Sequence, residues 1–312
     1  MQRFILRRLF YMFVTMLLAT LFVFSMSRIV GDPRLLYIQE GGYGLSEEAW
    51  DNLGKQLHLD KPVVVQYGYW LKDALRGNLG ESMLDRKPVT ELLMLSLGNT
   101  LQLALAGWLV ATLVGVPLGV LSAVKRGSIF DYLGRGVALL GQTLPVFWIG
   151  IMGILIFAVK LGWLPTGTMG QGDFSFKHFI MPAITLGWFS AAGYLRLTRS
   201  AMLDVMDSEY IKLARAKGVG ANVVLWKHGF KNAIIAPLTF SSLVLAGFIT
   251  GAIVTETVFS WPGLGRMIFN AVDDNDFPLM VGSMLLFTFM FLVVNLVTDL
   301  LYAYLDPRIR YS

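Results

Sequence analysis

Six long runs of apolar residues constrain the fold of this sequence more than any other feature. Each run holds roughly the 20 apolar residues that an α-helix needs to cross the hydrocarbon core of a bilayer. Because backbone polar groups inside lipid must be satisfied within the segment, such runs favour helices. The sequence therefore predicts an all-α, polytopic membrane protein with about six transmembrane helices. The runs occupy residues 9–30, 100–124, 136–161, 180–197, 233–255 and 278–304.

Composition agrees with a lipid environment. Of the 312 residues 55% are hydrophobic and 15% are charged, and the mean hydropathy is +0.60, whereas a soluble domain carries roughly 25% charged residues. The net charge of +5 is explained by cationic loops that face a cytoplasm, so we do not expect nucleic-acid binding. Cysteine is absent, which excludes disulfides, thiolate metal sites and cysteine nucleophiles.

The first apolar run follows three arginines, an arrangement that a secretory signal peptide shares with a retained anchor helix. The run is longer than a typical signal segment, and no convincing small-x-small cleavage site follows it, so we predict a retained N-terminal span over residues 1–30. The polar stretch after it, residues 31–94, is predicted to be an extracytoplasmic region. Within it, residues 63–75 are expected to lie against the membrane surface.

Lysine and arginine in the short loops predict the orientation. The N-terminus, the C-terminal tail and the loops at 125–135 and 196–231 carry 15 such residues, and the alternate short loops carry three. The long first loop is not counted because long segments are translocated largely regardless of their charge. Both termini and the loop at 204–231 are therefore predicted to be cytoplasmic.

Motifs of enzyme sites are missing from the sequence. It contains no phosphate-binding GxxxxGK[ST] loop, no HExxH helix and no nucleophile elbow, and its three histidines lie in unrelated segments. Charged residues of the spans fall near their ends, where the side chains can reach water. We therefore predict no enzymatic activity and no cofactor or metal site in this chain, and the pattern weighs against a proton-coupled carrier.

The segment at residues 204–231 is the most informative polar stretch. Asp207 or Ser208 can cap a helix that ends near Gly218, and a second short helix can begin after Gly220. Apolar and basic residues alternate so that one face can be buried and the other wetted, which is typical of an element that docks into a groove on a partner. A solvated basic loop is the alternative interpretation.

Four sequence matches resemble one transporter family. The run ARAKG at residues 214–218, preceded by EYIKL and followed by KHGFKNAIIAPL, resembles the coupling loop of bacterial ATP-binding-cassette (ABC) importer permeases. The runs RFILRRL, ETVFSWPGLGRM and YAYLDPRIRY resemble the B-type subunit of the oligopeptide, dipeptide and nickel branch. At Lys212 and His228 the sequence differs from the pattern of importer permeases in general, and the peptide branch differs from it at the same two positions. The resemblance is therefore to this branch in particular. It covers the whole chain.

The resemblance implies a type I (MetI-like) importer permease fold with a core at residues 95–304, a coupling loop at 204–231 and a cytoplasmic tail at 305–312. The implied partners are a homologous second permease, two cytoplasmic ATPase subunits that bind ATP and Mg²⁺, and an extracytoplasmic solute-binding protein. The implied location is the bacterial inner membrane.

The resemblance also assigns roles to individual residues. Residues expected to couple the chain to the ATPases are Glu209, Tyr210, Ala214, Arg215, Ala216, Lys217 and Gly218. Proline and glycine residues within the spans are expected to line a translocation path or to act as hinges in it, because proline kinks helices and GxxxG spacing lets backbones approach each other. These are Pro145, Pro237, Gly247 and Gly251.

The substrate stays open at this point. Members of the branch imply di- or oligopeptides, and nickel chelates, glutathione and oligosaccharides are the alternatives. Two other classes also remain, a secondary carrier and a membrane assembly protein. A secondary carrier typically has charged residues within its spans and an internal sequence repeat. A membrane assembly protein does not need a basic helix-turn-helix between two spans.

Overall fold

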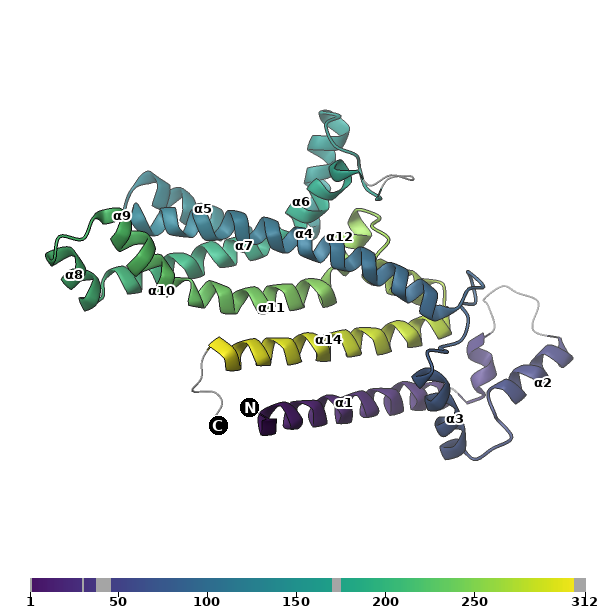
Figure 1. Cartoon of the computed structure of the whole chain (residues 1–312). Helices are drawn as coiled ribbons and strands as arrows, with labels where there is room; N and C mark the ends of the chain where they lie inside the picture. The colour runs from purple at the N-terminus through teal and green to yellow at the C-terminus, as the bar shows by residue number, and fades with distance from the viewer. Residues whose placement is uncertain (1, 30, 38–45, 170–174, 306–312) are drawn as a thin grey trace. The chain divides into compact units, whose positions relative to one another are not determined.

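The computed structural model describes residues 2–29, 31–37, 46–169 and 175–305, and the elements of this part of the chain are helices (Figure 1). In chain order they are α1 (Gln2–Ile29), η1 (Pro33–Tyr37), α2 (Glu47–Gln56), α3 (Val63–Leu75), α4 (Val89–Val124), α5 (Ile129–Thr143), α6 (Val146–Gly153), η2 (Ile154–Lys160), α7 (Phe176–Met206), α8 (Glu209–Ala216), α9 (Ala221–Val223), η3 (Val224–Phe230), α10 (Lys231–Ala233), α11 (Ile235–Gly251), α12 (Ile253–Val258), α13 (Leu264–Asp273) and α14 (Phe277–Leu305).

Several of these helices can cross a bilayer. In the described part of the chain, three are long and apolar enough, namely Ile5–Ile29 of α1, all of α4, and Phe277–Leu300 of α14. Two bent pairs, α5 with α6–η2 and α9–α10 with α11, raise the number to five if each pair is one span. The remaining predicted span, 180–197, lies inside the 31-residue helix α7. The all-α, polytopic membrane fold is thereby confirmed.

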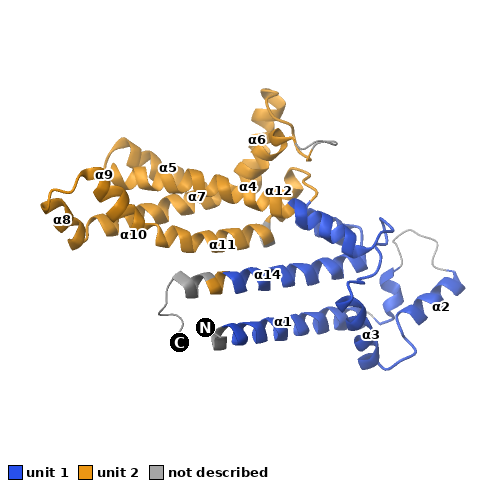
Figure 2. Ribbon diagram, viewed as in Figure 1, with its two compact units in different colours: residues 1–99, 263–297 blue, residues 100–262, 298–312 orange. Residues whose placement is uncertain are grey.

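The helices pack into two compact units (Figure 2). Unit 1 comprises residues 1–99 and 263–297, and unit 2 comprises residues 100–262 and 298–312. The two units are defined by how the helices pack and do not test the predicted division into a first span, an extracytoplasmic region and a permease core. That division stays a prediction. The predicted cytoplasmic tail lies outside the described residues from residue 306 onward.

In unit 1, the start of α4 packs against α13 and α14. Asp276 is buried and caps α14 by accepting a hydrogen bond from the backbone N–H of Leu279 at 3.2 Å. The same carboxylate accepts from the Ser82 hydroxyl and from the N–H of Met83 at 3.0 Å. The turn before α4 is thus joined to the start of α14. The apolar core beneath these contacts contains Val89, Leu93, Leu264, Ala271 and Leu279.

In unit 2, α4 and α7 approach each other at backbone distance. A Cβ added to Gly115 would lie 2.5 Å from the carbonyl oxygen of Ala191, and one added to Gly119 would lie 2.7 Å from that of Leu195. Real Cβ atoms do not approach this closely, so only glycine permits the contact. The GxxxG pair of α4 is therefore a helix contact within this chain, as small residues allow in membrane proteins.

Two bends interrupt the helices of unit 2 close to the prolines that the sequence singles out. The first bend, 103° between α5 and α6, has Pro145 as the N-cap of α6. Leu144 is extended, with ψ at 130°, because a residue before proline disfavours the helical region. The second bend, 44°, separates α10 from α11, and Pro237 lies in the first turn of α11.

Candidate functional site

The loop between α7 and α11 forms the predicted helix–turn–helix. The helix α8 ends at Ala216, and Gly218 adopts φ +78° and donates its N–H to the carbonyl oxygen of Arg215 at 2.9 Å. This left-handed position suits glycine, which has no Cβ to clash with the backbone. A Cβ at Gly218 would meet nothing within 4 Å, so any penalty there comes from backbone conformation and not from crowding. The predicted end of the helix is confirmed.

Two details of the loop differ from the sequence-based expectation. Ser208 precedes α8, but its hydroxyl donates to the carbonyl oxygen of Val205 and does not cap the helix. The second helix is a single α-turn, α9, which continues as the π-helix η3. Side-chain partners and π-helical turns depend on the surrounding packing, which a cap-residue pattern does not encode.

Two side chains attach α8 to the rest of unit 2, those of Ile211 and Tyr210. The side chain of Ile211 is fully buried, while Tyr210 and Leu213 are 44% and 56% exposed. The Tyr210 hydroxyl donates to the carbonyl oxygen of His228 at 3.3 Å, which ties α8 to η3. Tyr210 and Leu213 therefore leave apolar surface outside the chain, where a partner can reach it.

An apolar cluster, called the base below, lies where α4, α7 and α10 meet. Met202 near the end of α7 is fully buried against Val120 and Ala123 of α4 and Ala233 of α10. A Cβ at Gly229 of η3 would lie 2.9 Å from the sulfur of Met206, so η3 also packs closely on α7. Because cores of this density resist deformation, we expect α8 and the ends of α4 and α7 to move as one body.

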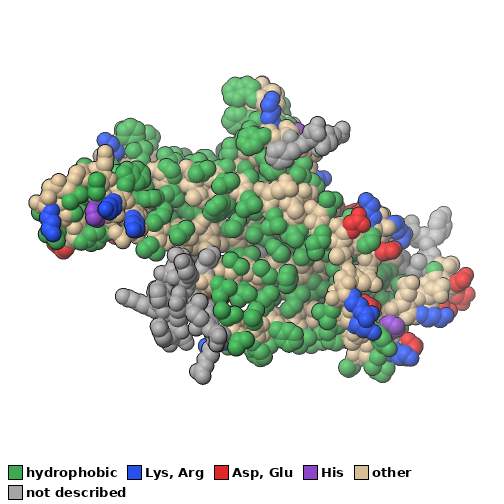
Figure 3. All heavy atoms as spheres, in the orientation of Figure 1, with side chains coloured by type: hydrophobic (Ala, Val, Ile, Leu, Met, Phe, Trp, Pro, Cys, Tyr) green, Lys and Arg blue, Asp and Glu red, His purple; other side chains and the backbone are tan. Residues whose placement is uncertain are grey.

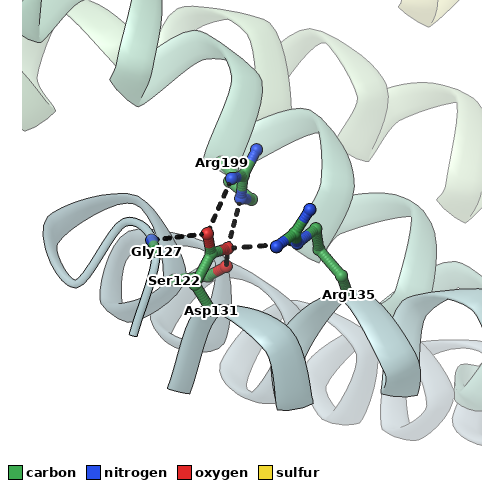
Figure 4. A network of polar contacts seen from close by, with 5 residues as sticks. All are labelled: Ser122, Gly127, Asp131, Arg135 and Arg199. Atoms are coloured by element: carbon green, nitrogen blue, oxygen red, sulfur yellow. Dashed lines mark hydrogen bonds and ion pairs between the residues drawn. The ribbon is translucent and has the colours of Figure 1, made fainter. Parts of the chain in front are cut away.

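A polar network lies close to the same base (Figure 4). Asp131 of α5 is buried and receives two hydrogen bonds from Arg199 of α7, at 2.7 and 2.9 Å. The same carboxylate accepts from the Ser122 hydroxyl at 2.7 Å and from the N–H of Gly127 at 3.0 Å. Arg135 of α5 lies 3.7 Å away. A buried carboxylate that is paired and hydrogen-bonded in this way avoids the cost of an isolated buried charge.

The network joins three helices, and one of them, α7, leads directly into the loop that contains α8. Ser122 belongs to the last turn of α4, Asp131 to the first turn of α5, and Arg199 to the part of α7 that leads into α8. Sequence reasoning counted the cations of this region for topology and missed the network. A signal was present, because Asp131 is the single acidic residue within 125–135 beside three cations.

Surface charge marks the same end of unit 2. Lys and Arg side chains gather over α8 and the segment η3–α10, whereas hydrophobic side chains dominate the visible face along the longer helices (Figure 3). Lys212 pairs with Glu209 at 2.7 Å, and Arg215 and Lys217 are exposed. Among the described residues, no group of His, Asp or Glu is arranged to hold a metal ion.

The seven predicted coupling residues lie together, while the predicted path residues are dispersed. Glu209, Tyr210, Ala214, Arg215 and Ala216 belong to α8, and Lys217 and Gly218 form its end. Pro145 and Pro237 lie at or near the two bends, Gly247 lies inside α11 with nothing within 4 Å of its Cβ position, and Gly251 is the last residue of α11. Their role in a path stays a prediction.

Comparison with known families decides the class of protein. The model of a family described as binding-protein-dependent transport system inner membrane component matches residues 115–311. The chain belongs to this family. A companion model, for the N-terminal part of such membrane components, matches residues 1–104 of this binding-protein-dependent permease. The predicted recognition of an importer permease is thereby confirmed.

Curated relatives of this family member align over their full length. A dipeptide transport system permease protein, DppB, from Alkalihalophilus pseudofirmus is 39% identical over 336 residues, with 100% of both chains covered. DppB of Escherichia coli K12 is 39% identical over 342 residues, also with full coverage. A glutathione transport system permease protein, GsiC, from Salmonella typhimurium is 38% identical over 313 residues and is covered completely.

Solved structures show the fold of this permease. An inward-facing structure of the MetNI methionine ABC transporter matches with a TM-score of 0.57 at 17% identity, covering 69% of this chain and 96% of that chain. A second crystal form of the same transporter matches with a TM-score of 0.56. The predicted type I importer permease fold is confirmed by this likeness, and the chain is a multi-pass inner membrane component of a transport system.

Proposed function

We propose that this chain is one of two homologous permease subunits of an ATP-driven importer for di- or oligopeptides. Relatives with dipeptide transport in their names, 39% identical over the full length, support the peptide substrate. In this proposal two cytoplasmic ATPase subunits bind ATP and Mg²⁺ and carry out hydrolysis, and an extracytoplasmic binding protein delivers the substrate. The termini and the α8 loop are cytoplasmic, as the distribution of Lys and Arg predicts.

The surface of α8 is the observation that carries the proposal. Its anchor Ile211 is fully buried within this chain, yet Tyr210 and Leu213 stay exposed beside the basic residues Arg215 and Lys217. Apolar side chains at the tip of a charged loop are typical of a helix that inserts into a groove of a partner protein. We assign that groove to the ATPase subunits, with Tyr210 and Leu213 as its apolar contacts.

Movement can pass from this loop to the spans. When ATP draws the ATPases together, α8 moves with the groove that holds it. The movement reaches α7 through η3, because α8 contacts η3 and η3 packs on α7. The ion pair between Asp131 and Arg199 joins α5 to α7, so both helices follow. The bends before α6 and α11 are the positions at which we expect the spans to turn.

Gly218→Val tests the coupling role, with Gly77→Val as a matched control. Gly218 at φ +78° and Gly77 at φ +81° both have open space around the Cβ position, so both variants carry similar backbone strain. A left-handed conformation costs an L-residue roughly 1 kcal/mol or more. We expect Gly218→Val to misdirect α9 and to abolish ATP-driven uptake and copurification of the ATPases.

The control variant, in the predicted extracytoplasmic region, is expected to retain both properties. The measurement is peptide uptake and ATPase copurification from membranes in which all subunits are expressed. Normal uptake by Gly218→Val would contradict the coupling role of α8.

Glutathione is the second candidate substrate, since GsiC is a glutathione permease and is 38% identical over the full chain. Identifying the ligand that copurifies with the partner binding protein separates the two candidates. ATP-independent uptake by the purified chain alone in liposomes, driven by an ion gradient, would instead support a secondary carrier.

A further inference from the structure

The helix α3 in unit 1 has two faces of different character. On one face Val64 and Leu75 are each 81% exposed, and Val65 and Tyr69 are also exposed. The opposite face contains the buried Gln66 and the half-buried Tyr67 and Trp70. Contact of this much apolar surface with water is unfavourable for a 13-residue helix, because apolar area is stabilised by removal from water.

The inward face of α3 is fixed to the outer part of α1. The Tyr67 hydroxyl and the Thr20 hydroxyl are hydrogen-bonded at 2.9 Å, and Arg28 donates to the Gln66 side chain at 3.0 Å. The Phe24 ring lies between these contacts, with its centroid 5.3 Å from that of Tyr67 and 5.8 Å from that of Trp70. Polar and aromatic contacts along α1 therefore hold α3 in one orientation.

The contacts with α1 place α3 beside the end of an apolar span. Arg28, which contacts Gln66, is one residue from the end of the span Ile5–Ile29, whereas Thr20, which the long Tyr67 side chain reaches, lies about 14 Å inside it at a rise of 1.5 Å per residue. Since α3 crosses the end of α1 and does not extend it (Figure 1), these contacts hold it beside the end of the span. Phe22, Met26 and Ile29 of α1 are exposed apolar residues near the same end of the span, so apolar surface of α1 lies beside that of α3 at this end of the span.

The polar residues of α3 suit the same location. Lys72 is exposed on the apolar face, one turn before Leu75, and Arg76 follows at the C-cap. Long cationic side chains at such positions can reach lipid phosphates while their stems stay in the apolar layer. Tyr and Trp side chains are enriched at membrane–water interfaces for a related reason, and α3 carries Tyr67, Tyr69 and Trp70.

We propose that α3 is an interfacial helix that inserts the side chains of Val64, Tyr69 and Leu75 into the phospholipid layer and places Lys72 and Arg76 at the phosphates. The partner is the bilayer surface at the C-terminal end of α1. With the orientation of the proposed function, this is the outer leaflet. The helix then holds the extracytoplasmic region at the membrane, independently of ATP and substrate.

Single-cysteine labelling tests the proposal cleanly, because the chain contains no cysteine. Val64→Cys and Leu75→Cys carry an environment-sensitive nitrobenzoxadiazole label, and Glu48→Cys on the exposed surface of α2 is the control. The full chain is placed singly in nanodiscs of phosphatidylethanolamine and phosphatidylglycerol with a shallow nitroxide-labelled lipid. We expect labels at 64 and 75 to show blue-shifted emission, quenching by the labelled lipid and protection from iodide, and the label at 48 to show the reverse.

The other occupants of this face give different results. Iodide quenching at positions 64 and 75 without lipid quenching would overturn the proposal. Protection that appears only after the binding protein is added, or only with two chains in each disc, would assign the face to a protein and would also overturn it. In the Leu75→Cys background, Val64→Asp is expected to cause loss of lipid quenching, and unchanged quenching would count against insertion. None of these readouts depends on coupling, so failure here leaves the proposed function intact.

Discussion

The glycine pairs of α4 and α11 share one spacing and have different surroundings. In α4, Gly115 and Gly119 face the backbone carbonyls of α7 at distances that admit no Cβ. In α11, the Cβ position of Gly247 has nothing within 4 Å. The GxxxG spacing therefore indicates that a close contact is possible, and the register of a neighbouring helix decides whether the contact is made.

The register of α4 and α7 explains the difference. Small residues recur every four positions along α4, at Gly107, Ala111, Gly115 and Gly119, so a strip of bare backbone follows one face. The α7 backbone lies along this strip, and Gly187 on α7 makes a reciprocal approach to the carbonyl oxygen of Gly107. In contrast, Gly247 stands in α11 where the described part of this chain brings no atom close.

Gly115→Val should have the largest effect on stability. The added carbon atoms would overlap the carbonyl oxygen of Ala191, which belongs to the backbone and cannot rotate away. Overpacking of this kind typically costs about 1–3 kcal/mol and sometimes more. We expect a clear drop in the thermal unfolding midpoint of the purified chain in detergent, or loss of the folded chain from the membrane.

The control for this variant is Gly136→Val in α5, where the Cβ position is open. Both substitutions place a β-branched residue in a helix, so the difference between them isolates the contact. Equal unfolding midpoints for the two variants would contradict the inference that the close approach of α4 to α7 requires glycine at position 115.

Gly193→Ala should have a smaller effect on stability than Gly115→Val and a larger one than Gly247→Val. A Cβ at this position of α7 would lie 3.0 Å from the Cζ atom of the Phe240 ring, the far end of a side chain that can shift. The strain is partly offset because alanine favours a helix over glycine by about 1 kcal/mol. We expect the unfolding midpoint to change by less than for Gly115→Val, and a drop of equal size would mean that the ring is held rigidly.

Gly247→Val should have the smallest effect on the isolated chain. The side chain enters open space, so we expect a stability change within about 0.5 kcal/mol and an unfolding midpoint close to that of Gly136→Val. In the assembled transporter, the same variant should lower uptake if Gly247 lines or hinges the path. Normal uptake together with normal stability would remove Gly247 from the predicted path residues.

The loop that contains α8 illustrates how far local sequence signals reach. Glycine at position 218 indicated the end of α8, because the left-handed conformation after a helix is a local requirement. The pattern of apolar and basic residues also predicted a docking surface. It did not reveal that Ile211 is the anchor and that Tyr210 and Leu213 stay exposed, since those roles depend on where η3 and α7 lie.

Apolar run length, glycine position and family motifs are local properties, so they suffice to predict the membrane class, most of the spans, the boundaries of α8 and the family. Helix packing instead sets which glycine pair is a helix contact, that Asp131 pairs with Arg199 at a separation of 68 residues, and that α3 is fastened to α1 through Thr20 and Tyr67. These contacts join segments far apart in the chain. Their existence depends on the register and approach of whole helices, which are set by packing over many residues.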